Sequence, residues 1–142
     1  MFAENTRVPV SQSRADIEKL LERGKAKQYG TAVDYDLMIA RVQFKLQDRI
    51  VRFTIALPDR KKFGAGVKFE RAERQRWRAL LLVIKAKLES VENQIEGFEE
   101  AFMSQIVMPD DKTVGQHVRP QIEAAYKTGK MPLGLNPAPE GK

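Results

Sequence analysis

Residues 38–57 read MIARVQFKLQDRIVRFTIAL, in which apolar and polar residues alternate on both sides of a polar pair. A period of two is typical of a β-strand that has one face buried. The pattern predicts an antiparallel hairpin with strands over 38–46 and 49–57, joined by Gln47 and Asp48. Because Gln-Asp is not a favoured pair for a two-residue turn, a slightly longer loop is the alternative.

The register of this hairpin would separate an apolar side from a polar one. With the turn at 47–48, Phe44 lies opposite Val51 and Val42 lies opposite Phe53, all on one side of the sheet. The other side is polar and mostly basic, and its basic members are Arg41, Lys45 and Arg52. One side is therefore expected to face the core and the other to face solvent.

Shorter elements are predicted before and after the hairpin. Ser13 is a suitable cap for a helix over 13–23, and 29–33 is expected to form a brief strand. A final short helix is expected over 121–127, with Pro120 near its first turn.

The stretch after the hairpin has the periodicity of a long helix over 70–107. Its apolar residues recur at steps of four and three, and they are Trp77, Leu81, Ile84, Leu88, Val91, Ile95, Phe98 and Phe102. Unbroken, this helix would be roughly 57 Å long, which exceeds the width of a small domain. Either Gly97 marks a break or part of the helix projects onto another subunit. We expect the first half to cover the hairpin. We expect Ile95, Phe98 and Phe102 to make a helix-to-helix contact, within or between chains, and we predict that it is the interface of a homo-oligomer.

These elements predict an α+β fold. In it, an antiparallel, hairpin-based sheet packs on a long C-terminal helix, and a short helix precedes the sheet. The expected organisation is one α+β domain over 1–130, followed by an extended proline-rich tail over 131–142. No stretch approaches membrane-spanning length and the first residues contain no apolar run, so a cytoplasmic location is expected.

Positive charge is concentrated in the middle of the chain. The formal net charge is +6, and residues 41–87 hold fourteen Lys or Arg against four Asp or Glu. Residues 88–111 hold seven Asp or Glu and no base. A basic block of this density suits a phosphate backbone, because each neutralised phosphate releases counterions. A solvated basic face without a polyanion partner is the alternative.

We expect the basic residues to form one continuous nucleic-acid-binding patch. The sheet would contribute Arg41, Lys45 and Arg52, a mobile loop over 59–69 would contribute Lys61, Lys62, Phe63 and Lys68, and the long helix would contribute Arg71, Arg74 and Arg78. Phe63 is the candidate to stack on a base, unless it folds back on the sheet edge.

Catalytic patterns are sparse. The chain has no cysteine and a single histidine, His117, which is expected at the surface or at the start of a helix. Asp34 or Asp36 followed by Lys45 on a strand matches the spacing of metal-dependent nucleases, and this is a minor alternative. We predict a non-enzymatic protein without a cofactor or a metal.

Two resemblances concern parts of the chain. The order helix, three strands, a loop with Gly64 and Gly66, then a helix resembles the layout of double-stranded RNA-binding domains over 13–90. Residues 74–89, RQRWRALLLVIKAKLE, resemble a stretch of small uncharacterised phage and prophage proteins.

Together these features predict an accessory protein that binds DNA or RNA with little sequence preference in phage DNA or RNA metabolism. The alternative is an oligomeric assembly module that docks an acidic protein through the basic block.

Overall fold

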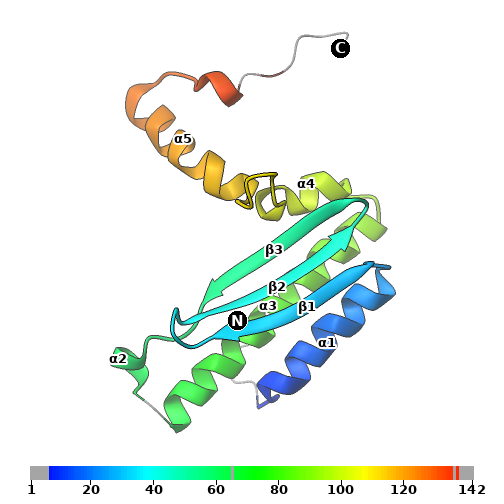
Figure 1. Cartoon of the computed structure of the whole chain (residues 1–142), viewed down its shortest axis with the longest axis vertical. Helices are drawn as coiled ribbons and strands as arrows, with labels where there is room; N and C mark the ends of the chain where they lie inside the picture. Colours follow the sequence, from blue (N-terminus) through cyan, green and yellow to red (C-terminus); the bar gives the residue numbers. More distant parts are fainter. Residues whose placement is uncertain (1–6, 65, 136, 138–142) are drawn as a thin grey trace.

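The protein has a mixed helix and sheet fold, seen here in a computed structural model that describes residues 7–64, 66–135 and 137 (Figure 1). Its strands are β1 (Gln28–Asp34), β2 (Ile39–Leu46) and β3 (Arg49–Ala56). Its helices are α1 (Val10–Arg23), α2 (Arg60–Phe63), α3 (Val67–Glu92), α4 (Phe98–Phe102) and α5 (Val114–Thr128), with single 3-10 turns η1 (Met103–Gln105) and η2 (Leu133–Leu135). The strands form an antiparallel sheet in the order β1-β2-β3.

The predicted hairpin and its register are confirmed. Phe44 pairs with Val51 and Val42 pairs with Phe53 in the ladder between β2 and β3. Gln47 and Asp48 have φ angles of 50° and 60°, so the connection is a two-residue turn and the longer loop was wrong. Left-handed conformations at both positions match the twist of the flanking strands, and this geometry outweighs the weak turn preference of Gln-Asp.

The sheet has an inner face, which carries Val42, Phe44, Val51 and Phe53, and an outer face made by the alternate strand residues. The inner face packs on α1 and α3, whose fully buried side chains include Ile17, Leu21, Trp77 and Ile84. This confirms that the first half of the long apolar seam covers the hairpin. Because successive strand residues point to opposite faces, burying one face leaves the other available to solvent.

The first helix begins earlier than expected. The backbone N–H groups of Gln12 and Ser13 donate to the carbonyl of Pro9 at 3.0 and 3.1 Å, so α1 already runs from Val10. Ser13 is buried within the helix and does not cap it, so the capping prediction was wrong. The expected brief strand over 29–33 is confirmed by β1.

The long apolar seam belongs to two helices. The longest helix, α3, has 26 residues and lies in the middle of the chain, so the predicted long C-terminal helix is corrected. After α3, Gln94 has a φ of 61° and the Ile95 N–H donates to the carbonyl of Ser90 at 2.9 Å, which ends the helical ladder. Gly97 precedes the first residue of α4, and its N–H donates to the Glu100 carboxylate at 3.0 Å. Of the two alternatives, the helix is therefore broken, but it ends at Glu92 and Gly97 is the residue before the next helix.

This break places the aromatic residues of α4 in the chain's own core. The Phe102 ring lies 5.6 Å from the Phe44 ring and 6.2 Å from the Phe53 ring, both edge-on. Lys87 of α3 donates to the carbonyl of Ala101 at 2.7 Å and ties α4 to α3. Phe98 and Phe102 are both buried within this one chain, so their assignment to an oligomer interface was wrong.

Ile95 has a different environment from the two phenylalanines that were grouped with it. It lies in the turn between α3 and α4, where its side chain is 79% exposed. The helical period that placed Ile95 beside Phe98 no longer applies, because the helix stops before it.

Phe102→Ala is expected to destabilise the protein by about 3–5 kcal/mol, because it leaves a cavity beside two core rings. Ile95→Ala removes an exposed side chain and is expected to change stability by less than about 0.5 kcal/mol. Denaturant unfolding of both variants measures the difference. Equal losses would place Ile95 in the same core as Phe102.

The segment over 59–69 contains local structure where a mobile loop was expected. Asp59 accepts a hydrogen bond from the Lys61 N–H at 2.8 Å and caps the single turn of α2. The guanidinium of Arg60 lies 5.7 Å from the centre of the Tyr35 ring and 5.0 Å from that of Phe69. These cation–π contacts connect α2 to α3 and to the turn between β1 and β2.

Tyr35 also anchors this turn through its hydroxyl. The hydroxyl donates to the carboxylate of the buried Glu73 at 2.6 Å, and this hydrogen bond raises the pKa of Tyr35 above 10.0. Folding therefore favours the neutral phenol. Its contribution to stability is fully present below pH 10.0 and is lost as the pH rises through the raised pKa.

Tyr35 is expected to ionise at a higher pH than an ordinary tyrosine in an ultraviolet absorbance titration. Tyr35→Phe is therefore expected to remove this high-pH ionisation step. The same substitution is expected to weaken the pH dependence of unfolding above pH 10.0, because the group responsible for it is gone. An unchanged titration curve would contradict the Tyr35–Glu73 contact.

After α4 the chain forms a small hairpin against the free edge of β3. The Val107 N–H donates to the carbonyl of Ile50 at 2.7 Å, and the Val114 N–H donates back to the carbonyl of Ile106 at 2.9 Å. In the turn of this hairpin the Asp111 N–H donates to the carbonyl of Met108 at 2.9 Å, and Asp111 has a φ of 67°. The edge of β3 is thus covered along part of its length.

The last long helix begins before the expected 121–127. Thr113 and Gln116 form a capping box in which each side chain accepts the other's backbone N–H, at 2.8 and 3.2 Å, so α5 starts at Val114. Pro120 consequently lies inside the helix, not in its first turn. Gly129 ends α5 in the left-handed conformation, with a φ of 71°.

The expected extended tail over 131–142 contains η2, and residue 136 and residues 138–142 lie outside the described part of the chain. Within the described part, no helix is both long enough and apolar enough to cross a membrane.

Candidate nucleic-acid interface

The outer face of the sheet presents basic and small side chains. Register places Arg41 between Ala32 and Thr54, and it places Gln43 between Gly30 and Arg52. The core helices pack on the inner face, and Arg41 and Gln43 are exposed. The small residues of β1 leave the surface above them unoccupied, because a Cβ atom placed at Gly30 would meet nothing within 4 Å.

Two hollows meet on this face. The first, of about 390 Å³, lies over β1 and β2 and is lined by Gly30, Arg41 and Lys45 among others. The second, of about 310 Å³, lies between the outer face and the start of α5, and Arg41, Arg52 and Arg119 line it. Arg41 lines both hollows. We call these two hollows, which share Arg41, the sheet channel.

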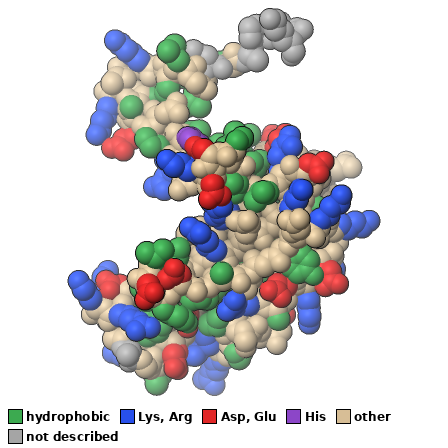
Figure 2. All heavy atoms as spheres, viewed as in Figure 1, with side chains coloured by type: hydrophobic (Ala, Val, Ile, Leu, Met, Phe, Trp, Pro, Cys, Tyr) green, Lys and Arg blue, Asp and Glu red, His purple; other side chains and the backbone are tan. Residues whose placement is uncertain are grey.

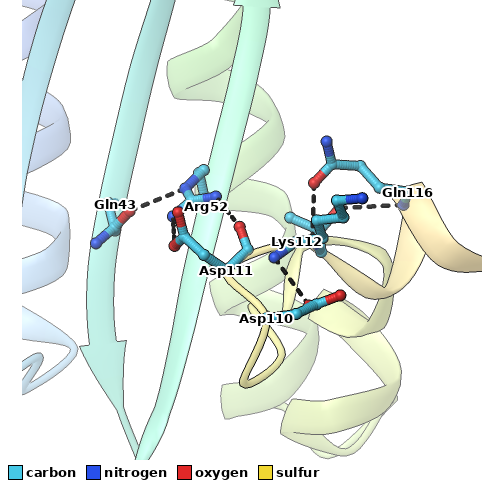
Figure 3. Close-up of polar contacts among 7 residues, drawn as sticks. Gln43, Arg52, Asp110, Asp111, Lys112 and Gln116 are labelled. Carbon is cyan, nitrogen blue, oxygen red and sulfur yellow. Dashed lines mark hydrogen bonds and ion pairs between the residues drawn. The ribbon is translucent and has the colours of Figure 1, made fainter.

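Arg52 lies at one side of this channel, and each of its three guanidinium nitrogens contacts another group of the chain (Figure 3). One guanidinium nitrogen contacts the Asp111 carboxylate at 2.6 Å, a second donates to the Asp111 carbonyl at 2.8 Å, and the third donates to Gln43 at 3.0 Å. The Arg52 side chain is only 12% exposed. Its predicted role as a phosphate contact is therefore corrected, because Arg52 holds the 108–112 turn against the sheet.

A second contact fixes the start of α5. His117, in the second turn of the helix, contacts the Asp110 carboxylate at 2.8 Å. The Lys112 N–H donates to the other Asp110 oxygen at 3.1 Å, and both hydrogen bonds lower the pKa of Asp110, with the one from His117 having the larger effect. The surface or helix-start position expected for His117 is confirmed. These contacts hold Arg119 at the edge of the sheet channel.

The other predicted basic residues do not join this channel. Lys61, Lys62 and Phe63 are exposed on α2, and Lys68 and Arg71 are exposed at the start of α3. Arg78 contacts Asp16 of α1 at 3.6 Å, and Arg74 is half-buried. The prediction of one continuous patch was wrong in its geometry, because α3 packs on the inner face while Arg41 and Lys45 point from the outer face. The exposed Lys61, Lys62, Lys68 and Arg71 form a separate group, which we call the α2–α3 cluster. Figure 2 shows basic side chains mixed with acidic ones at the end of the molecule that holds α2.

Sequence reasoning missed Arg119 and Lys112, which lie in or beside the second hollow. A local signal for Arg119 was present, because Thr113 followed three residues later by Gln116 is a capping box. Extending the last helix back to this box would have placed Arg119 in an ordered element. Its approach to Arg41 depends on tertiary contacts that no local pattern contains.

The nuclease alternative is not supported by the positions of its residues. One oxygen of Asp34 accepts the N–H groups of Asp36 and Leu37 at 2.8 and 2.9 Å, so this carboxylate caps a turn. Asp34 pairs with Ile39 at one end of β2, whereas Lys45 lies at the other end. Among the described residues, no group of three or more His, Cys, Asp or Glu could hold a metal ion.

Comparison of the chain with protein-family models, curated proteins and solved structures finds no significant match. The expected order of a helix, three strands and a helix over 13–90 is present, with α2 inserted before α3. This order describes topology alone, and function has to be argued from the site.

The Arg52–Asp111 contact is expected to contribute no more than about 1 kcal/mol, because Asp111 is 84% exposed and water screens the pair. A double-mutant cycle with Arg52→Ala and Asp111→Ala, followed by denaturant unfolding, measures this coupling. A coupling energy clearly above about 1 kcal/mol would contradict the screening of this pair by water.

Proposed function

We propose that the protein binds DNA or RNA without catalysis, with the phosphate backbone lying in the sheet channel. The observation that carries the proposal is the position of Arg41 at the junction of the two hollows, with Lys45 in one and Arg119 in the other. Among the described contacts, none of these three side chains has a hydrogen bond to, or an ion pair with, a protein group. Their charge is therefore available to an external anion.

The chemistry of the channel favours backbone contacts over reading of bases. None of the outward-facing strand residues that the structure describes is aromatic, and the two aromatic residues that line the first hollow, Tyr29 and Phe44, belong to the alternate, inner-facing set. Lys and Arg on phosphate supply affinity without sequence information. Binding with little sequence preference and strong salt dependence follows from this composition.

The α2–α3 cluster is the competing contact surface within the same function. Its residues are exposed and close in sequence, but the described pockets do not include them, and Glu70 and Asp59 lie among them. The second hollow of the sheet channel presents charge from the sheet and from α5, whereas the α2–α3 cluster presents charge from one side only. The resemblance of residues 74–89 to phage proteins supports a setting in phage DNA or RNA metabolism.

The test compares two triple variants with the same change in charge. The first variant removes three positive charges from the sheet channel and combines Arg41→Ala, Lys45→Ala and Arg119→Ala. The second removes three positive charges from the α2–α3 cluster and combines Lys61→Ala, Lys62→Ala and Lys68→Ala. Affinity for labelled single- and double-stranded oligonucleotides is measured at several salt concentrations. Each lost phosphate contact reduces the log-log salt slope by about 0.7–0.9.

The channel variant is expected to reduce the log-log salt slope by the equivalent of roughly two to three phosphate contacts. The cluster variant is expected to retain most of the wild-type slope. A larger effect from the cluster variant would move the interface to α2 and α3. Absence of binding by the wild type at low salt, to either kind of strand, would overturn the function itself.

A further inference from the structure

The available positive charge of the outer face lies in a single row. Arg41 and Lys45 are both on β2, which is the middle strand of the sheet. The β1 strand contains no base, and Arg52 of β3 is already engaged by other groups of the chain. Four residues of β2 span roughly 14 Å, whereas neighbouring strands lie only about 5 Å apart. The row is therefore long and narrow, and it has the width of one strand.

A double helix would need charge on both sides of this row. It presents two phosphate backbones, which are separated by grooves about 6 Å and about 12 Å wide. On the β1 side, the outward-facing Gly30 and Ala32 carry no charge. On the β3 side, the Asp111 side chain is 84% exposed and would repel a second backbone. The outer face can thus neutralise one backbone and not two.

The second hollow limits the width of the ligand more directly. Arg41 lines it from the sheet, Arg119 lines it from α5, and its volume is about 310 Å³. Pockets for one small molecule hold about 300–1,000 Å³, so this hollow has the size of a single nucleotide unit and is too small for a base pair. A duplex is also stiff, with a persistence length of about 50 nm, and does not bend into so short a channel.

The α5 helix is the competing element for a duplex. It projects from the rest of the molecule (Figure 1), and a projecting helix can enter a major groove. Beyond Arg119, however, its charged residues are Glu123 and Lys127, which form an ion pair at 3.2 Å. The projecting part of α5 therefore has no net charge with which to hold a duplex.

We propose that the sheet channel binds a single strand of nucleic acid and discriminates against a duplex. This inference rests on the proposed function and adds the class of its ligand. One phosphate backbone follows the row from Lys45 to Arg41 and then passes between the sheet and Arg119. The bases point away from the sheet, so affinity comes from phosphate contacts and depends little on sequence.

The test uses three labelled probes: a short DNA strand, the RNA strand of the same sequence, and the DNA strand annealed to its complement. Fluorescence anisotropy gives the affinity of the wild type for each probe at several salt concentrations. Both single strands are expected to bind about tenfold more tightly than the duplex, because the duplex loses at least one charge-assisted contact. Their log-log salt slope is expected to be roughly 2, because three contacts contribute about 0.7 each.

A variant without any change in charge tests whether the strand lies in the channel. Gly30→Leu and Thr54→Leu together narrow the first and the second hollow. Both residues are exposed on the outer face, and a Cβ atom at Gly30 meets nothing within 4 Å, so the protein is expected to fold. The matched control is Ala56→Leu, an exposed position on the same face of β3 that lines neither hollow.

The double variant is expected to lose single-strand affinity, while the control keeps it. Thermal melts check that both proteins fold, and each single substitution repeats the comparison if the double variant does not. Equal or tighter binding of the duplex by the wild type, or unchanged single-strand binding by the narrowed channel, would overturn the inference and leave nucleic-acid binding in place. Absence of binding to all three probes at low salt would instead overturn the proposed function.

Discussion

Packing on only one face of the three-stranded sheet governs the rest of this molecule. The alternation in β2 and β3 sends Val42, Phe44 and Phe53 to the inner face, where α1, α3 and α4 converge. Every second residue is then committed to the outer face, and there the chain places Arg41 and Lys45. The core and the sheet channel are therefore two consequences of the same period of two.

The position of α5 follows from contacts at the edge of this sheet. Ile106 pairs with Val51 at the edge of β3, and Arg52 holds the following turn through its contact with Asp111. These contacts bring Arg119 beside the outer face. They also direct the remainder of α5 away from the core, so Arg119 and the exposed Ile122 and Tyr126 lie on the same helix.

The accuracy of sequence reasoning depended on the range of the interactions. The hairpin register was predictable because each apolar residue has its partner only a few residues away. A break in the long helix near Gly97 was one of two alternatives that the sequence left open. The sequence could not decide between them, because the apolar spacing that includes Phe102 is the same in one continuous helix and in two helices that pack together. The Arg52–Asp111 contact joins residues 59 positions apart, and no local pattern indicates it. The split of the basic residues follows from α3 packing on the inner face, which composition alone does not reveal.

The central claim is that the outer face, and not the helical side, meets nucleic acid. Nuclear magnetic resonance of the nitrogen-labelled protein, titrated at low salt with a short oligonucleotide, tests it most directly. The account predicts that the largest backbone amide shifts occur at Gly30, Arg41, Gln43 and Gly115, around the sheet channel. Shifts confined to α2 and the start of α3 would contradict it.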